Sequence, residues 1–319
     1  MQEIKIVENT SELGAGTRGA SLGIGALQVV ARQRNEDFFG QYERFFVGER
    51  NEMLDFPTIY SHAKRIDGLA EVFQNTVDIL DFIYQENNFP LVLSGDHSCA
   101  AGTIAGIKKA HPNKRLGVIW IDAHADLHTP YTTPSGNVHG MPLAVALGSD
   151  NLESKVNDPK PEVVEMWEEL KNVGHNSPKL LAEDLVFISV RDTEQPEDEF
   201  MARNQIKNYS VDEVREKGMN AVSNEIKERM TSCDIVYVSF DVDSMDSILV
   251  SKGTGTPVEN GLTPEEADFF VCEFASWDKT CCVEMVEINP CLDNKINKMA
   301  EVAYDILSNC AVTIEKRFK

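Results

Sequence analysis

The sequence predicts a single-domain α/β fold in which a parallel β-sheet is covered by helices on both faces. The predicted strands, such as residues 115–121 and 234–240, are nearly continuous apolar runs, which is typical of strands buried on both faces. Stretches with helical apolar spacing separate these strands, and this alternation favours a parallel sheet. With 319 residues, 42% of them hydrophobic, the chain can form one large core, so we expect one domain over residues 1–319.

The elements follow in order from local patterns. Six strands are expected, at residues 3–8, 89–93, 115–121, 185–190, 234–240 and 281–288. Helices are expected from residue 21, over 67–86 and 98–110, from 139, over 163–170 and 211–230, from 264, and over 294–310. The clearest helix start is Thr263-Pro264-Glu265-Glu266, because Thr is a good N-cap, Pro suits the first helical position and Glu completes a capping box.

Two stretches between these elements have unusual composition. The glycine-rich residues 14–25 match neither the P-loop nor the dinucleotide-binding pattern, so a tight strand-to-helix connection is expected there. Residues 148–184 are polar and rich in Lys and Glu, and we interpret them as a polar surface insertion in the domain. Such an insertion could shape a pocket rim, pack between subunits or be a solvated excursion.

Charge and composition narrow the function classes. The net charge of −22 would repel nucleic acid and anionic membranes and attract a small cationic substrate, so no nucleic-acid or membrane partner is expected. No apolar run is long enough for a transmembrane helix, and the N-terminus lacks the order of a signal peptide. The expected location is therefore the cytoplasm. Seven Cys residues, an odd number, suit reduced and buried thiols better than a disulfide framework.

Acidic and imidazole side chains follow three of the predicted strands at the point where each strand ends. They are His97, Asp122, His124, Asp126, Asp241 and Asp243. Residues two apart in a strand point to the same side, so these side chains converge at one edge of a parallel sheet. Four carboxylates and two imidazoles without a thiolate favour hard divalent ions such as Mn²⁺. Six ligands suit two ions that share a carboxylate and a water molecule.

Four sequence blocks resemble the signatures of the ureohydrolases, the family of arginase, agmatinase and their relatives. They are GDHS at 95–98, DAHAD at 122–126, SFDVD at 239–243 and EINP at 287–290. TPYTTPSGNVHG at 129–140, followed by GTGTP at 253–257, is most similar to arginases. The resemblance covers nearly the whole chain. It implies an arginase-like, three-layer fold with a central parallel sheet of about eight strands.

The resemblance also implies a role for each site residue. One Mn²⁺ would be held by His97, Asp122, Asp126 and Asp241, and the second by His124, Asp122, Asp241 and Asp243. A hydroxide between the two ions would attack the guanidinium carbon. Glu287 would pair with the guanidinium, and His139 would shuttle protons. Asp126 would be a catalytic residue as well as a metal ligand. Ser135, Asn137 and His128 would contact the substrate carboxylate, and Glu194 and Glu197 the α-amino group.

The expected reaction is therefore hydrolysis of L-arginine to L-ornithine and urea by a homo-oligomer, a trimer or hexamer by resemblance. Two departures bear on the substrate: arginases usually have Asn where this chain has His128, and Asp where it has Glu194. One alternative is a sister hydrolase acting on formiminoglutamate, guanidinobutyrate or agmatine, although Ser135 and Asn137 disfavour agmatine. Another is a non-catalytic binding protein, which predicts lost ligands, and none is lost.

Overall fold

The computed structural model describes residues 2–175 and 177–319, and its centre is one eight-stranded, all-parallel sheet. The strand order is β2-β1-β3-β8-β7-β4-β5-β6. The strands are β1 Ile4–Asn9, β2 Glu43–Phe46, β3 Phe89–Ser94, β4 Leu116–Ile121, β5 Leu185–Ile188, β6 Lys207–Tyr209, β7 Ile235–Asp241 and β8 Thr280–Val286. The predicted α/β class and the expected number of strands are confirmed.

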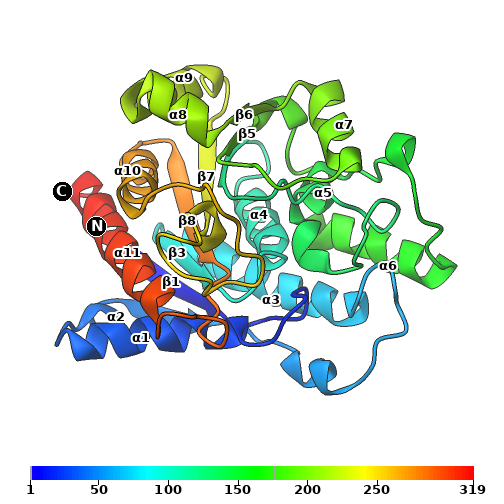
Figure 1. The fold of residues 1–319 in the computed structure, drawn as a ribbon, viewed down its shortest axis with the longest axis horizontal. Coiled ribbons are helices and arrows are strands. Elements are labelled where there is room, and N and C mark those ends of the chain that lie inside the picture. The colour runs from blue at the N-terminus through cyan, green and yellow to red at the C-terminus, as the bar shows by residue number, and fades with distance from the viewer. Residues whose placement is uncertain (1, 176) are drawn as a thin grey trace.

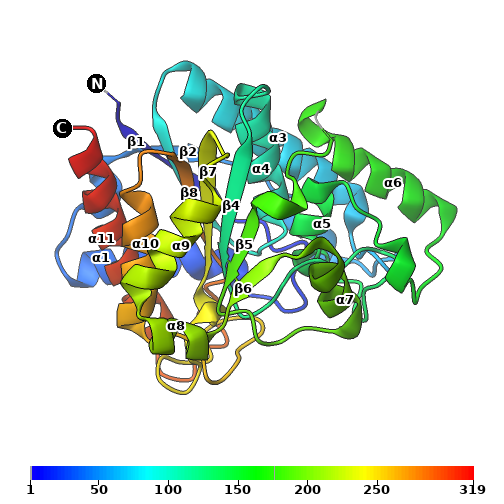
Figure 2. The ribbon, with the colours of Figure 1, turned by 90° about the horizontal axis from the view of Figure 1, so that it is seen from above.

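Helices cover both faces of this sheet (Figures 1 and 2). They are α1 Gly23–Gln33, α2 Phe38–Gln41, α3 Ile66–Gln85, α4 Cys99–Ala110, α5 Pro142–Leu147, α6 Pro161–Asn172, α7 Gln195–Asn204, α8 Val211–Lys217, α9 Met219–Arg229, α10 Pro264–Ala275 and α11 Lys298–Arg317. One hydrophobic core joins the sheet to α1, α9, α10 and α11, and the other joins it to α3, α4, α5 and α6. The protein therefore has the expected three layers.

The structure corrects several predicted boundaries. The helix predicted over 211–230 is two helices, because Gly218 between α8 and α9 has φ 85 and leaves the helical conformation. The final helix begins at Lys298 instead of residue 294, because Ile296 and Asn297 have left-handed backbone conformations. It ends at Arg317, beyond the predicted residue 310. The edge strands β2 and β6 and the helices α2 and α7 had not been predicted from the sequence.

The polar segment at 148–184 carries a buried face in the part of it that is described. Val163, Trp167 and Leu170 of α6 belong to the core shared with α3 and α4. Its interpretation as an insertion stays a prediction. Four Cys residues are buried as expected, but Cys291 is exposed, so that expectation is wrong for this residue. None of the helices in the described residues combines the length and hydropathy that a bilayer crossing requires.

Candidate metal centre

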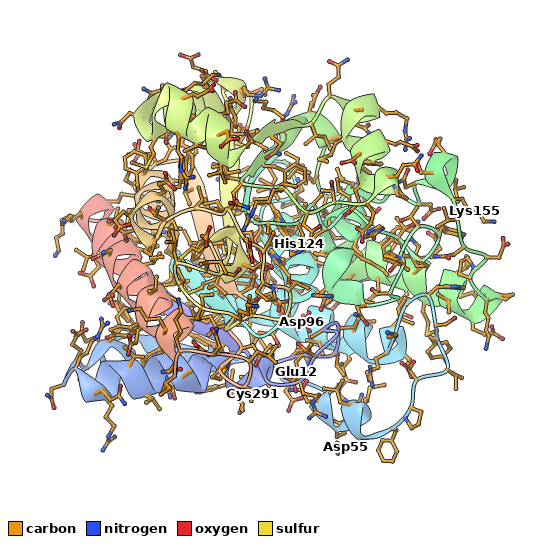
Figure 3. The ribbon with its side chains drawn as sticks, viewed as in Figure 1. Glu12, Asp55, Asp96, His124, Lys155 and Cys291 are labelled. Carbon is orange, nitrogen blue, oxygen red and sulfur yellow. The ribbon has the colours of Figure 1, made fainter. Side chains whose placement is uncertain are left out.

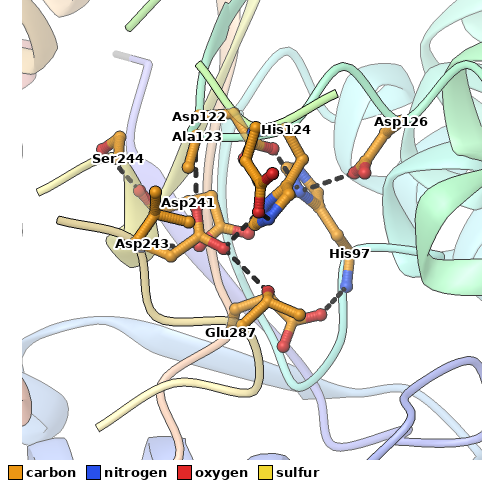
Figure 4. Close-up of polar contacts among 12 residues, drawn as sticks. His97, Asp122, Ala123, His124, Asp126, Asp241, Asp243, Ser244 and Glu287 are labelled. Atoms are coloured by element: carbon orange, nitrogen blue, oxygen red, sulfur yellow. Dashed lines mark hydrogen bonds and ion pairs between the residues drawn. The ribbon is translucent and has the colours of Figure 1, made fainter. Parts of the chain in front are cut away.

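The six predicted metal ligands meet at one edge of the sheet (Figure 4). His97 follows β3, Asp122 to Asp126 follow β4, and Asp241 and Asp243 lie at the end of β7. These strands are close neighbours in the order β3-β8-β7-β4, so their carboxyl ends open onto the same crevice. Figure 3 shows His124 near the middle of the molecule in that view.

His97 forms the first group of ligands. Its Nδ1 atom lies 3.0 Å from Asp122 Oδ2, 3.1 Å from Asp241 Oδ2 and 3.2 Å from Asp126 Oδ2. Its other ring nitrogen, Nε2, is 2.8 Å from Ser239 Oγ, and the ring stacks on Trp120 with centroids 4.0 Å apart. The imidazole is therefore fixed in orientation, with one nitrogen facing three carboxylates.

His124 forms the second group. Its Nδ1 atom lies 3.0 Å from Asp243 Oδ2 and 3.5 Å from Asp122 Oδ1. Asp122 thus contributes to both groups, as a bridging carboxylate must. The described residues bring His97, Asp122 and Asp126 together as one possible ion site and Asp122, His124 and Asp243 as another. The assignment of Asp241 to both ions stays a prediction.

Backbone amides hold one oxygen of each of three carboxylates and leave the other directed at the centre. The amide of His124 donates to Asp122 Oδ1, that of Asp243 to Asp241 Oδ1, and that of Ala123 to Asp243 Oδ1. Two buried atoms, His97 Nδ1 and Asp122 Oδ2, make no hydrogen bond. Buried polar atoms seldom remain unpaired, and this oxygen-rich set with two imidazoles fits divalent cations.

The electrostatics of the site also favour a cation. Burial opposes the charged form of His97, yet Asp122, Asp126 and Asp241 outweigh it and raise the pKa of His97 well above its ordinary value. Burial, followed by repulsion from Asp243 and Asp122, raises the pKa of Asp241. Buried negative charge contributes to both shifts, although burial itself is the larger cause for Asp241. A bound cation would compensate this negative charge directly.

Members of both groups, among them His97, His124 and Asp126, line a cavity of about 260 Å³. Its walls come from loops that follow β4 and β5 and include the predicted substrate residues His128, Ser135, Asn137, Glu194 and Glu197. His139 also lines it. The structure therefore brings the predicted head-group residues and the predicted proton shuttle to one cavity.

His128, the predicted contact of the substrate carboxylate, lies beside the two glutamates of this cavity. Its Nε2 atom is 2.8 Å from Glu194 Oε2 and 3.4 Å from Glu197 Oε2, while Nδ1 faces Thr132 Oγ1 at 3.2 Å. The hydrogen bond from His128 lowers the pKa of Glu194 to about 2, and burial raises the pKa of Glu197 to about 7. One ring nitrogen of His128 is thus directed at the acidic pair in this pocket.

Glu287 and His139 lie together beside the ligands. Glu287 is buried, and its Oε1 accepts from the backbone amide of His97 and lies 3.3 Å from His139 Nδ1. Although burial opposes it, this contact raises the pKa of His139 to about 9. Glu287 has φ 66, and such strain is common where a side chain must be aimed at a site.

Sequence reasoning missed several residues of this site. Thr256 Oγ1 donates to Asp243 Oδ2 at 3.0 Å, Asp192 Oδ2 lies 3.7 Å from His124 Nε2, and Lys64 donates to Asn137 Oδ1 at 3.0 Å. Thr256 lies within the GTGTP block, and Asp192 lies two residues after the predicted 185–190 strand. Their positions in the sequence could therefore have indicated that they belong to the site. Lys64 comes from a distant loop, and its position gave no such indication.

Comparison with known proteins identifies the family. The model of the Arginase family matches residues 8–313. The chain belongs to the arginase family. It is 36% identical to an arginase from Brevibacillus brevis over 97% of both chains. Its fold matches the native structure of Bacillus caldovelox arginase at pH 5.6, with TM-score 0.80, 34% identity and 98% of both chains covered. It also matches Entamoeba histolytica arginase in complex with L-ornithine, with TM-score 0.79, 26% identity and 99% of both chains covered.

Membership of the arginase family makes this chain a metal-dependent amidinohydrolase of the ureohydrolase type. The groups at the ends of β3, β4 and β7 that could hold ions are the candidates for the metal centre of such an enzyme. The recognition made from the four sequence blocks is confirmed.

Proposed function

We propose that this member of the arginase family holds two Mn²⁺ ions and hydrolyses L-arginine to L-ornithine and urea. The observation that carries the proposal is the composition of the cavity. Its floor is the two-part ligand cage, and its wall holds an acidic pair, Glu194 and Glu197. A cationic guanidinium near the floor and an α-ammonium at the wall would match these negative groups.

The ligand set would divide between the two ions as the family resemblance implies. His97, Asp122, Asp126 and Asp241 would hold one ion, and His124, Asp122, Asp241 and Asp243 the other. When bound, such ions supply Lewis-acid activation of a water molecule at neutral pH.

Glu287, Asp126 and His139 would serve the reacting end of the substrate. The Glu287 carboxylate can take two guanidinium N–H groups side by side, and the His97 amide already fixes one of its oxygens. Burial, followed by Asp122, raises the pKa of Asp126, so Asp126 is suited to accept a proton from the attacking water. His139 lines the cavity as a proton donor whose raised pKa keeps it charged at neutral pH. It would protonate the departing amine and recover the proton from solvent.

Ser135 and Asn137 would hold the α-carboxylate. Lys64, which donates to Asn137 Oδ1, adds positive charge next to that position. Glu194 and Glu197 would receive the α-ammonium. The cytoplasmic location and the homo-oligomeric state expected from the sequence are further parts of this proposal.

A second candidate is hydrolysis of a guanidino or formimino acid that lacks a free α-ammonium group. The hydrogen bond between His128 and Glu194 favours it, because the His128 ring already occupies the carboxylate that an ammonium would need. Guanidinobutyrate and formiminoglutamate are the substrates of this kind. Agmatine, which lacks a carboxylate, leaves Ser135 and Asn137 without a role.

The test is turnover by Mn²⁺-loaded protein. Urea release is measured with L-arginine, agmatine and guanidinobutyrate, and formamide release with formiminoglutamate. We expect kcat/KM to be highest for L-arginine. A higher value for guanidinobutyrate or formiminoglutamate would contradict the substrate assignment while leaving the hydrolase intact.

A further inference from the structure

The wall of the cavity carries a further cluster of metal-ligating side chains, made by His128, Glu194 and Glu197. One ligand atom of each residue lies within 4.8 Å of those of the other two. His128 Nε2 is 2.8 Å from Glu194 Oε2 and 3.4 Å from Glu197 Oε2. Three nitrogen and oxygen ligands are the number that Zn²⁺ takes from the protein at sites that also hold a water molecule.

The His128 ring is held with one nitrogen directed at the two carboxyl groups. The residue is buried, and its Nδ1 atom faces Thr132 Oγ1 at 3.2 Å. Thr132 is itself fixed, because its hydroxyl oxygen accepts from the backbone amide of Thr129 at 3.0 Å. A ring whose far nitrogen has its own hydrogen-bond partner is the usual arrangement of a metal-ligating histidine. Nε2 is therefore the nitrogen that can meet an ion in the cavity.

Glu197 is the fixed carboxyl group of the cluster, and Glu194 is the movable one. Glu197 is buried, its Oε1 accepts from the Leu127 amide at 3.0 Å, and its Oε2 accepts from the Glu194 amide at 3.2 Å. A carboxylate oxygen has two acceptor positions, so Oε2 can bind an ion as well. The Glu194 side chain is 55% exposed, so it can shift without disturbing the core.

The distances in the cluster fit a tetrahedral Zn²⁺ site. Zn–N and Zn–O bonds of about 2.0–2.2 Å place neighbouring ligand atoms roughly 3.3–3.6 Å apart. The separation of 3.4 Å between His128 and Glu197 has this value. The separation of 2.8 Å between His128 and Glu194 is shorter, so Glu194 would move outward by roughly half an ångström. A water molecule in the cavity can take the fourth position.

The charge of the cavity also favours a cation at this place. Within the described residues, the lining contains acidic side chains and imidazoles but no Lys or Arg. A divalent ion would supply the positive charge that the two glutamates lack. An imidazole ligand favours Zn²⁺ over harder ions such as Mn²⁺.

We propose that His128, Glu194 and Glu197 form a Zn²⁺ site in the wall of the cavity, in addition to the two ion positions of the metal centre. Glu194 and Glu197 are also the groups assigned to the α-ammonium, so a bound Zn²⁺ would compete with L-arginine. This competition rests on the proposed function, whereas the binding of Zn²⁺ by the cluster does not. Zn²⁺ would thus inhibit the enzyme at its substrate pocket.

Capping of α7 is the competing explanation for the two glutamates. Glu194 is the N-cap residue and Glu197 the third helical residue, and together they form a capping box. His128 has no part in this cap, so His128→Asn removes one ligand and keeps the start of the helix intact. His111→Asn makes the same change at the end of α4, outside the cavity, and is the matched control.

The experiment counts the metal ions bound per subunit. Mn²⁺-loaded parent, His128→Asn, Glu194→Gln and His111→Asn are dialysed against fixed free Zn²⁺ concentrations, and bound Mn and Zn are measured by elemental analysis. Physiological salt screens binding to the surface charge. The total is the deciding quantity, because exchange of Mn²⁺ for Zn²⁺ at the metal centre leaves it unchanged.

In the parent and in His111→Asn we expect the total to rise from two ions to three. In His128→Asn and Glu194→Gln the third ion should bind more than about 100-fold more weakly, because even a residue behind a metal ligand alters affinity about 10- to 100-fold. Either of these two variants decides if the other does not fold.

Steady-state kinetics are the second readout. With free Zn²⁺ fixed in an excess of Mn²⁺, Zn²⁺ should raise KM for L-arginine in the parent and leave KM unaffected in His128→Asn. A total that stays at two in the parent, or that reaches three equally well in His128→Asn, would overturn the inference alone. If the totals are as expected but L-arginine is not hydrolysed, the Zn²⁺ site is supported and the proposed function is overturned.

Discussion

His128 is the residue at which this cavity departs most from the pattern usual in arginases. Its imidazole is hydrogen-bonded to Glu194, so the α-ammonium of L-arginine would have to compete with it for that carboxylate. Asn at this position has no charge and would leave Glu194 available. Under the proposed function, a single side chain would therefore adjust the affinity for the head group while the proposed metal ligands stay unchanged.

For His128→Asn we expect KM for L-arginine to fall roughly tenfold at similar kcat, since a hydrogen bond to a charged group contributes about 1.5–3 kcal/mol. Steady-state kinetics of the Mn²⁺-loaded variant check this. Guanidinobutyrate has no α-amino group, so its KM should not fall and serves as the control. A rise in KM for L-arginine would mean that His128 itself holds the substrate carboxylate.

His139 makes the stability of the metal-free protein depend on pH. Its pKa is raised on folding from about 6.5 to about 9, so its contribution to the free energy of unfolding is complete below about pH 6.5 and is lost as the pH rises through 9. His139→Gln removes this contribution. In denaturant unfolding, the difference in stability between parent and variant should therefore be larger at pH 6 than at pH 10. An equal difference at both values would contradict the raised pKa.

At the scale of elements, the loop at 129–140, which carries Ser135 and Asn137 to the cavity, is held against the loop at 56–64. Gly136, between Ser135 and Asn137, has φ 78, and a Cβ atom there would lie 1.9 Å from Ser61 O. Its carbonyl accepts from the amide of Lys64 at 2.7 Å. The loop at 129–140 can approach the loop at 56–64 only because this residue is glycine.

Gly136→Ala should separate these two loops, raise KM for the substrate and destabilise the protein by roughly 1–3 kcal/mol. Mn²⁺ affinity should not change, because the ligands lie on other segments. Gly25→Ala in α1, where a Cβ atom would meet nothing within 4 Å, is the control, and we expect it to be neutral or stabilising by up to about 1 kcal/mol. Parallel kinetics and denaturant unfolding compare the two; equal effects would argue against a special role for the loop contact.

How much of this the sequence could predict depends on the element. The buried strands and the convergence of acidic and imidazole side chains at their ends were predictable, because apolar runs and two-residue spacing are local signals. The edge strands β2 and β6 have four and three residues and partly exposed side chains, so their pattern is weak. The pairing of His128 with Glu194 depends on how closely the loops after β4 and β5 approach each other, which no local pattern reports.

At the scale of the whole molecule, the cage joins the ends of three strands that are far apart in the chain. Without a cation, four buried carboxylates repel one another across these strands, and only the imidazoles compensate. The net charge of −22 adds a weaker, general attraction for cations over the entire surface. Metal binding should therefore raise the free energy of unfolding of the whole protein. The contribution of ions held in the cage must be separated from that of ions attracted by the overall surface charge.

Asp241→Asn tests this, because it should have opposite effects on Tm in the metal-free and in the Mn²⁺-loaded protein. Its carboxylate is destabilised by burial and by its acidic neighbours, so in metal-free protein the neutral amide should raise Tm by a few degrees. In the parent, Mn²⁺ at about 100 times its Kd should contribute about 2.7 kcal/mol, or roughly 5 °C in Tm, and Asp241→Asn should lose most of this gain. Asp158→Asn makes the same change of charge at a side chain that is 92% exposed and should keep the full shift.

Thermal unfolding followed by circular dichroism, with EDTA or Mn²⁺, measures all three proteins. If Asp158→Asn loses as much as Asp241→Asn, the stabilisation comes from the general charge of the protein and not from the cage.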